Sequence, residues 1–192
     1  MSYSPRRQLA GLALPLALAF ALPTHAAFAQ NAIDSKSAAH IRDQYMADLD
    51  TVHAKILALA TAIPAEKYEW RPAAGVRSVS QVLMHVTHEY YYYVPSSLAG
   101  KTPAGFGDPG AAEQRLAKIT KKSEVLAELA KAWAHTKSQV ASADAAHLTG
   151  KYKPWGITID QAALSMSGDL HEHLGQLITY ARVNGVKPPW TK

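Results

Sequence analysis

Residues 158–185 read TIDQAALSMSGDLHEHLGQLITYARVNG, and this stretch decides the fold. Thr158 is a good N-cap, Gly185 is the residue type expected just past a helix end, and Pro188–Pro189 prevents continuation. Between these signals, apolar residues recur at helical spacing and therefore share one face. This stripe contains Ile159, Ala163, Met166, Leu170, Leu177 and Ala181. We predict one long helix from Thr158 to about Asn184, with one face in a core.

Three other segments carry the same period. They are predicted at Ser35–Ile63, from Ser78 to near Pro95, and at Ser123–Ala143. Ser78 and Gln81 form a capping-box pattern, and Ser123 is the expected cap of the third segment. A connection rich in glycine and proline spans 100–110, and the pattern leaves open whether 111–121 adds a turn of helix. No segment alternates with period two, so the sequence predicts an all-α four-helix bundle.

The first 29 residues have the pattern of a secretory signal peptide. Arg6 and Arg7 precede an apolar run from Leu9 to Leu22, and Ala27-Phe28-Ala29 fits a cleavage site. The run is short for a membrane span. We therefore predict a signal peptide at 1–29 and a mature periplasmic or secreted domain at 30–192, with no membrane contact after cleavage. Sec and twin-arginine export both remain open.

The composition excludes several kinds of bond, metal ligand and binding partner. The chain has no cysteine, which excludes disulfides and thiolate metal ligands. Loss of the two signal-peptide arginines lowers the net charge from +5 to +3. Lysines and acidic residues are interspersed rather than gathered in a basic stripe, so we expect no nucleic-acid partner.

The fourth predicted helix carries a candidate metal-binding pair. Asp169 and His173 are four residues apart, which places both side chains on one helical face one turn apart. Gln176 and Tyr180 continue nearly the same line beside core positions, as potential pocket-lining groups. A buried carboxylate without a partner is costly, and a metal ion is one possible partner. Spacing alone also fits an ordinary solvated hydrogen bond between Asp169 and His173.

The second predicted helix offers His85 and His88 as further ligands. His85 follows the apolar stripe more closely and is the better interior candidate. His88 and Glu89 suit the rim of the site or a place behind the ligands, where a carboxylate can orient a ligating imidazole. Two imidazoles and one carboxylate leave coordination positions open, as in many catalytic zinc and non-haem iron sites. The remaining histidines of the mature chain are predicted to be exposed: His40, His53, His135, His147 and His171.

Two blocks resemble the DinB-like family. One runs from Arg77 through His85 to Glu89, and the other runs from His171 through Gln176 to Pro188–Pro189. The resemblance implies a four-helix bundle holding a metal by three side chains, typically histidines. It assigns the first ligand to His85 and the last to His173, and it puts Asp169 where the middle histidine usually stands.

We therefore predict one divalent metal held by His85, Asp169 and His173, with zinc or nickel expected and iron or manganese as alternatives. The family includes proteins similar to thiol-dependent transferases or isomerases. The leading functional hypothesis is a metal-dependent hydrolase or transferase with an unidentified small-molecule substrate. The alternative is a non-catalytic periplasmic metal-binding or structural protein. A homodimer is compatible with the resemblance.

Overall fold

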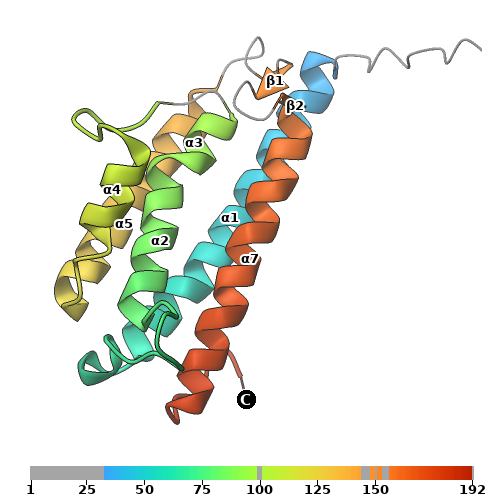
Figure 1. The fold of residues 1–192 in the computed structure, drawn as a ribbon. Helices are drawn as coiled ribbons and strands as arrows, with labels where there is room; N and C mark the ends of the chain where they lie inside the picture. Colours follow the sequence, from blue (N-terminus) through green and yellow to red (C-terminus); the bar gives the residue numbers. More distant parts are fainter. Residues whose placement is uncertain (1–32, 99–100, 144–147, 150, 153–155, 192) are drawn as a thin grey trace, which may run out of the picture. The chain divides into compact units, whose positions relative to one another are not determined.

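The computed structural model describes residues 33–98, 101–143, 148–149, 151–152 and 156–191. The predicted signal peptide lies outside these residues. Four long helices make up most of the described fold (Figure 1): α1 (Ser35–Ala62), α2 (Val79–Tyr91), α5 (Lys122–Ala141) and α7 (Ile159–Val183). The all-α bundle predicted from the sequence is confirmed.

Short elements connect the long helices. They are η1 (Ala65–Lys67), α3 (Tyr93–Ser97), α4 (Pro109–Leu116), β1 (Lys151–Tyr152) and β2 (Ile157–Thr158). β1 and β2 form a two-residue antiparallel pair in which Lys151 lies opposite Thr158. Their shortness explains why no alternating pattern is visible in the sequence. Among the helices that the structure describes, none has both the length and the apolar character needed to cross a bilayer.

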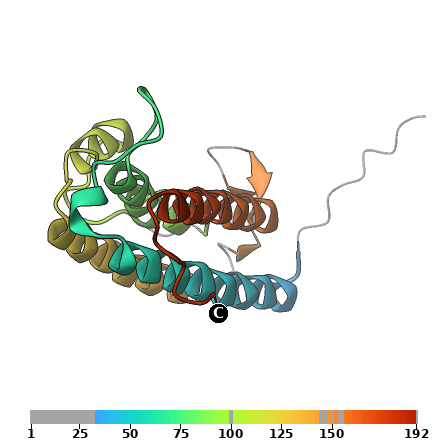
Figure 2. The same cartoon turned by 90° about the horizontal axis from the view of Figure 1, so that it is seen from below.

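The bundle is built from two extensively packed helix pairs. α7 packs along α1, as the view from below in Figure 2 shows, and α2 packs along α5. Leu49, Leu83, Leu129 and Leu177, one from each long helix, are fully buried at the shared core. Each such side chain contributes about 2 kcal/mol of apolar transfer free energy. α2 also contacts α3, α4 and α7, so polar groups on α2 lie within the bundle.

Helix boundaries follow local chemistry. α7 ends in a Schellman motif, in which Val186 N–H donates to Ala181 O at 2.9 Å and Gly185 N–H donates to Arg182 O at 3.0 Å. Gly185 has φ +75°, which glycine adopts without steric cost. The end predicted near Asn184 is thus confirmed.

Two boundaries differ from the prediction. The second helix breaks at Tyr92, with φ −122° and ψ −67°, before the α3 turn continues to Ser97. Pro95 has no N–H to donate to the carbonyl four residues earlier, which accounts for the break. The third helix begins at Lys122, after Lys121 and not after a Ser123 cap. Lys122 Nζ donates to the carbonyls of Thr61 (2.6 Å) and Ile63 (2.8 Å) and so ties the start of α5 to the end of α1.

α4 is the helix that the sequence left undecided. It begins one residue after Asp108, whose Oδ1 accepts from Ala111 N at 2.8 Å, and Pro109 occupies its first position. An acidic N-cap followed by proline is a recognised start signal. The residues interpreted as the end of a loop therefore begin a helix, and this helix supplies a group to the candidate site.

Two histidines predicted to be exposed, His53 and His135, are less exposed than expected. His53 is buried, and its ring stacks on Trp133 with centroids 4.2 Å apart. Burial lowers the pKa of His53 to about 4, so its ring is neutral at neutral pH. His40 and His171 are exposed as predicted, His135 is half-buried, and His147 lies outside the described residues.

The capping box of α2 gives a first testable prediction. Gln81 N donates to Ser78 Oγ at 3.3 Å, and Ser78 N donates to Gln81 Oε1 at 3.0 Å. Ser78→Ala should lower the free energy of unfolding by about 1 kcal/mol, measured by urea denaturation. Ser123→Ala, at an exposed serine that caps no helix, should change it by less than about 0.5 kcal/mol. Equal effects for both variants would contradict the assignment.

Candidate metal centre

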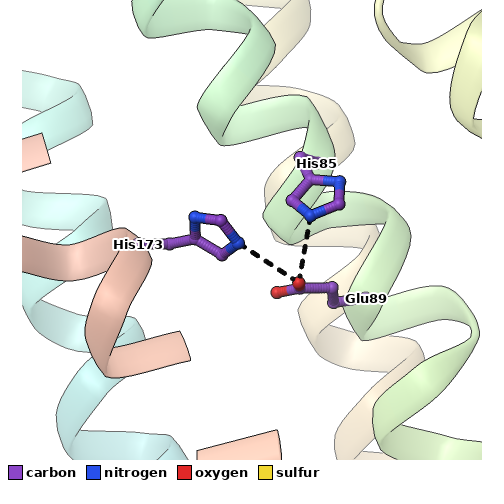
Figure 3. Close-up of side chains that lie close together, drawn as sticks. All are labelled: His85, Glu89 and His173. Carbon is purple, nitrogen blue, oxygen red and sulfur yellow. Dashed lines mark ion pairs between the residues drawn. The ribbon is translucent and has the colours of Figure 1, made fainter. Parts of the chain in front are cut away.

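His85, Glu89 and His173 meet between α2 and α7, as Figure 3 shows. Each offers one ligand atom, and these atoms lie within 4.8 Å of one another. Glu89 Oε1 is 3.3 Å from His85 Nε2 and 3.4 Å from His173 Nε2. The two imidazole rings meet edge to face at 87°, so both can direct a nitrogen toward one point. We call these three residues the triad.

Helix geometry accounts for this arrangement. His85 and Glu89 are one turn apart on α2 and therefore share a face. That face is directed at α7, where His173 follows Leu170 and precedes Leu177, both of which are buried. The Glu89 side chain is only 2% exposed, and those of His85 and His173 are 16% and 13% exposed. The triad is thus largely shielded from solvent.

Burial sets the charges of the triad. It raises the pKa of the Glu89 carboxyl to about 7, against the lowering effect of nearby His173. Burial also lowers the pKa of His85, and the charges of Arg77 and His173 act in the same direction. For His173, burial favours the neutral ring, but contact with Glu89 outweighs it and raises the pKa. Burial thus favours the neutral form of the Glu89 carboxyl, and a cation beside it would favour the charged form.

The polar atoms of the triad fit a bound cation. Glu89 Oε2 and His173 Nε2 are both buried without a hydrogen-bond partner among the described residues. Unsatisfied buried polar atoms are uncommon and costly. A divalent cation would neutralise the carboxylate and engage the free nitrogen, and two imidazoles with one carboxylate form a recognised ligand set.

Asp169 lies at the edge of the triad. Its Oδ1 is 3.9 Å from His173 Nε2, and its side chain is 40% exposed. Its carboxyl group is also near enough to Glu89 to raise the pKa of that carboxyl. Its role as a direct metal ligand stays a prediction, whereas Glu89, which the sequence suggested for the second shell, lies between the two histidines.

His88 lies against α4 instead of in the triad. It is buried, and its Nε2 is 3.0 Å from the carbonyl oxygen of Pro109. Its ring stacks on Phe106 with centroids 5.6 Å apart. In the described structure, His88 therefore anchors the start of α4 against α2.

Gln176 and Tyr180 lie behind His173, on the same face of α7 as predicted. Gln176 Oε1 is 3.3 Å from His173 Nδ1, and Gln176 Nε2 donates to the Tyr180 hydroxyl at 2.9 Å. Tyr180 in turn donates to the main-chain oxygen of Arg77 at 3.1 Å. These residues support the histidine ring from its outer side.

Glu113 is a site residue that the sequence interpretation missed. It comes from α4, and its Oε1 lies 2.7 Å from His85 Nδ1 and 3.1 Å from Arg77 Nη2. Burial by itself would raise the pKa of the Glu113 carboxyl. The pKa is nevertheless lowered, because His85 donates a hydrogen bond to Glu113 and the charges of His85 and Arg77 stabilise the carboxylate. The Asp108-Pro109 start signal indicated α4 in the sequence, but no spacing rule relates Glu113 to His85.

A cavity of about 430 Å³ opens onto two residues of the triad, His85 and Glu89. His85, Glu89 and Asp169 line it together with Tyr93, Ser165 and Met166. His85, Glu89 and Asp169 therefore face a space that can admit a small molecule. A second cavity of about 250 Å³ lies beside the outer side of His85 and includes Arg77 and Glu113 in its wall.

Comparison with known proteins gives one finding. The family model described as DinB superfamily matches residues 48–177, which include α2, α4, α5, most of α7 and the whole triad. Comparisons with curated proteins and with solved structures gave no significant match. Because the matched region covers more than half of the chain, the protein belongs to the DinB superfamily.

Proposed function

We propose that the protein is an exported metal-dependent enzyme, of hydrolase or transferase type, that acts on a small molecule. His85, Glu89 and His173 would hold one divalent ion, with zinc or nickel as the expected metal. The observation that carries this proposal is the cavity lined by His85, Glu89 and Asp169. A purely structural ion needs no such access, because structural sites are closed by protein ligands.

The roles of the residues follow from their positions. A bound divalent ion would supply Lewis-acid chemistry, which lowers the pKa of a water or thiol toward neutrality. Glu89 would balance the charge of the ion from a buried position. Asp169, half-exposed at the cavity and 3.9 Å from His173 Nε2, is placed to accept a proton from an incoming nucleophile. Tyr93, Ser165 and Met166 would contact the substrate.

Cobalt substitution tests whether the site is accessible. The protein is loaded with Co²⁺, and its visible spectrum is recorded while a small thiol or azide is added. If the site is open, the visible spectrum should change as the thiol or azide is added and should level off once the site is saturated, because the added ligand enters the coordination sphere. A spectrum that does not respond would favour a closed structural site and contradict the enzyme proposal.

Two matched variants test whether the added ligand enters through the cavity. Ser165→Trp places a large ring in its wall and should weaken the response to the thiol while Co²⁺ still binds. Ser138→Trp, at an exposed position on α5, should leave the response unchanged. Equal responses in the two variants would mean that ligands reach the ion by another path.

Export is part of the proposal and has its own test. It is supported by the order of paired arginines, apolar run and Ala27-Phe28-Ala29 in the first 29 residues. The protein is expressed with its own N-terminus in a Gram-negative host. It should be recovered in the periplasmic fraction, with the mass of a chain that begins at Gln30. A full-length cytosolic product would contradict export without affecting the metal site.

A further inference from the structure

The outer nitrogens of both triad histidines are held by separate hydrogen-bond chains. On one side, Glu113 Oε1 contacts His85 Nδ1 at 2.7 Å. On the other side, Gln176 Oε1 contacts His173 Nδ1 at 3.3 Å. The Nε2 atoms of both rings are directed at Glu89 (Figure 3). These contacts determine which ring nitrogen carries the proton, and that nitrogen cannot serve as a metal ligand.

Both nitrogens of His85 face a carboxylate, but Nδ1 lies only 2.7 Å from Glu113 Oε1 whereas Nε2 lies 3.3 Å from Glu89 Oε1, so the proton of a neutral ring belongs on Nδ1. A carboxylate can only accept a hydrogen bond, so a 2.7 Å contact requires the proton on His85 Nδ1. Arg77 Nη2 also lies 3.3 Å from this nitrogen, but it is closer, at 3.1 Å, to the same Glu113 oxygen. Arg77 thus holds Glu113 in place, and the neutral His85 ring presents an unprotonated Nε2 to the interior.

The chain behind His173 leads to the same result. The main-chain oxygen of Arg77 can only accept, so the Tyr180 hydroxyl donates its proton there. The Tyr180 oxygen is then the acceptor for the Gln176 amide N–H at 2.9 Å. This fixes the amide so that its oxygen faces His173 Nδ1, which must carry the proton. Because His173 Nε2 makes no hydrogen bond among the described residues, a neutral His173 ring also presents this nitrogen unprotonated toward Glu89.

We propose that Glu113 and the Gln176–Tyr180 pair are positioning residues that hold His85 and His173 in the Nδ1–H form, with both Nε2 atoms prepared for the metal. Arg77 joins the two chains, through its guanidinium on one side and its carbonyl on the other. The role in metal binding rests on the proposed function. The tautomers themselves are a property of the metal-free protein and can be measured separately.

Imidazole ¹⁵N chemical shifts test the tautomers directly. Long-range ¹H–¹⁵N correlation spectra are recorded on the metal-free protein over a pH series, and the tautomers are assigned from spectra in which both rings have lost their positive charge. His85 and His173 should each show a protonated Nδ1 and an unprotonated Nε2. His171, whose Nε2 lies 3.0 Å from Asp48 Oδ1, should show the opposite pattern and serves as an internal reference.

Variants then interrupt each of the two hydrogen-bond chains in turn. Glu113→Leu should shift His85 toward the Nε2–H form and lower Zn²⁺ affinity by about 10–100-fold, the range known for outer-shell partners. Glu113→Gln should restore most of both properties, because Arg77 keeps an oxygen next to Nδ1. Glu172→Leu, at an exposed position next to His173, is the matched control and should change neither property.

The chain behind His173 is tested by Gln176→Leu and Gln176→Glu. The leucine removes the acceptor for Nδ1–H and should shift the His173 tautomer, whereas the glutamate keeps an acceptor and should preserve it. Tyr180→Phe is a milder third variant that frees the amide to turn, and it covers the case in which a leucine variant does not fold. Its His173 signals should show a mixture of tautomers.

The outcomes separate this inference from the proposed function. Nε2–H forms in the wild type, or tautomers that none of the variants changes, would overturn the inference even if metal binds. If both histidines are in the Nδ1–H form but the protein binds no metal, the positioning roles stand and the metal-dependent function is overturned. A loss of Zn²⁺ affinity in Glu113→Leu without any change of the His85 tautomer would mean that Glu113 acts through charge, and would also overturn the inference.

Discussion

Replacing His173 with alanine should lower the affinity of the protein for Zn²⁺ by more than about 100-fold, beyond the loss that changes in outer-shell partners cause. His173 Nε2 lies 3.4 Å from Glu89 and is buried without a hydrogen-bond partner among the described residues. Its removal leaves two triad ligands and an uncompensated Glu89 carboxylate. Isothermal titration of the chelator-treated protein with Zn²⁺ measures the change.

His171→Ala is the matched control for this experiment. His171 is on the same helix two residues away, but its side chain is 44% exposed and binds Asp48 on α1. We expect its affinity for Zn²⁺ to equal that of the wild type. A similar loss in both variants would show that the metal binds surface histidines instead of the triad.

The same titration decides between the two carboxylates. Glu89 lies between the histidines with 2% of its side chain exposed, whereas Asp169 is farther from His173 and 40% exposed. Glu89→Gln should therefore cost more Zn²⁺ affinity than Asp169→Asn. The reverse order would make Asp169 the third ligand, as the family resemblance implied.

The second large effect concerns stability in the absence of metal. Burial raises the pKa of Glu89 from 4.5 to about 7 in the folded chain, so between these values the folded state holds a proton that the unfolded state has lost. The free energy of unfolding must then fall as the pH rises through this window. The raised pKa of His173 acts in the same direction. The Glu89 contribution amounts to about 3 kcal/mol by pH 8.

Glu89→Gln should remove most of this pH dependence. At mildly alkaline pH the metal-free variant should be more stable than the metal-free wild type, because it buries no carboxylate. Urea denaturation at several pH values, with chelator present, measures the difference. Glu172→Gln, at an exposed glutamate, should follow the wild-type curve. A wild-type curve that rises with pH relative to Glu89→Gln would contradict the buried position of Glu89.

The sequence was sufficient for the bundle and for two of the three triad residues. Helical periodicity and end signals placed the four long helices, because a core face and a helix end each leave a local pattern. The Asp169–His173 spacing indicated the part of α7 that carries His173, which the structure places beside His85 and Glu89. His85 required the orientation of α2 and the family resemblance, since it has no partner at helical spacing except Glu89.

The carboxylate of the triad and the residues that hold the two histidines from outside could not be predicted from local pattern. Glu89 and Asp169 each lie four residues from a triad histidine, and only the packing of α2 on α7 buries one and leaves the other half-exposed. Glu113 reaches His85 from a separate helix, 28 residues away along the chain. His53 was misassigned because its stacking on Trp133 joins α1 to α5. Each of these depends on tertiary contacts.

The metal content of the native protein tests the central claim most directly. The mature chain is purified without added metal or chelator, and elemental analysis is combined with a protein assay on wild type, His173→Ala and His171→Ala. We predict about one equivalent of a divalent transition metal in the wild type and in His171→Ala, and a large loss in His173→Ala. A wild-type protein without metal that also fails to bind Zn²⁺, Ni²⁺, Fe²⁺ or Mn²⁺ on titration would contradict the claim.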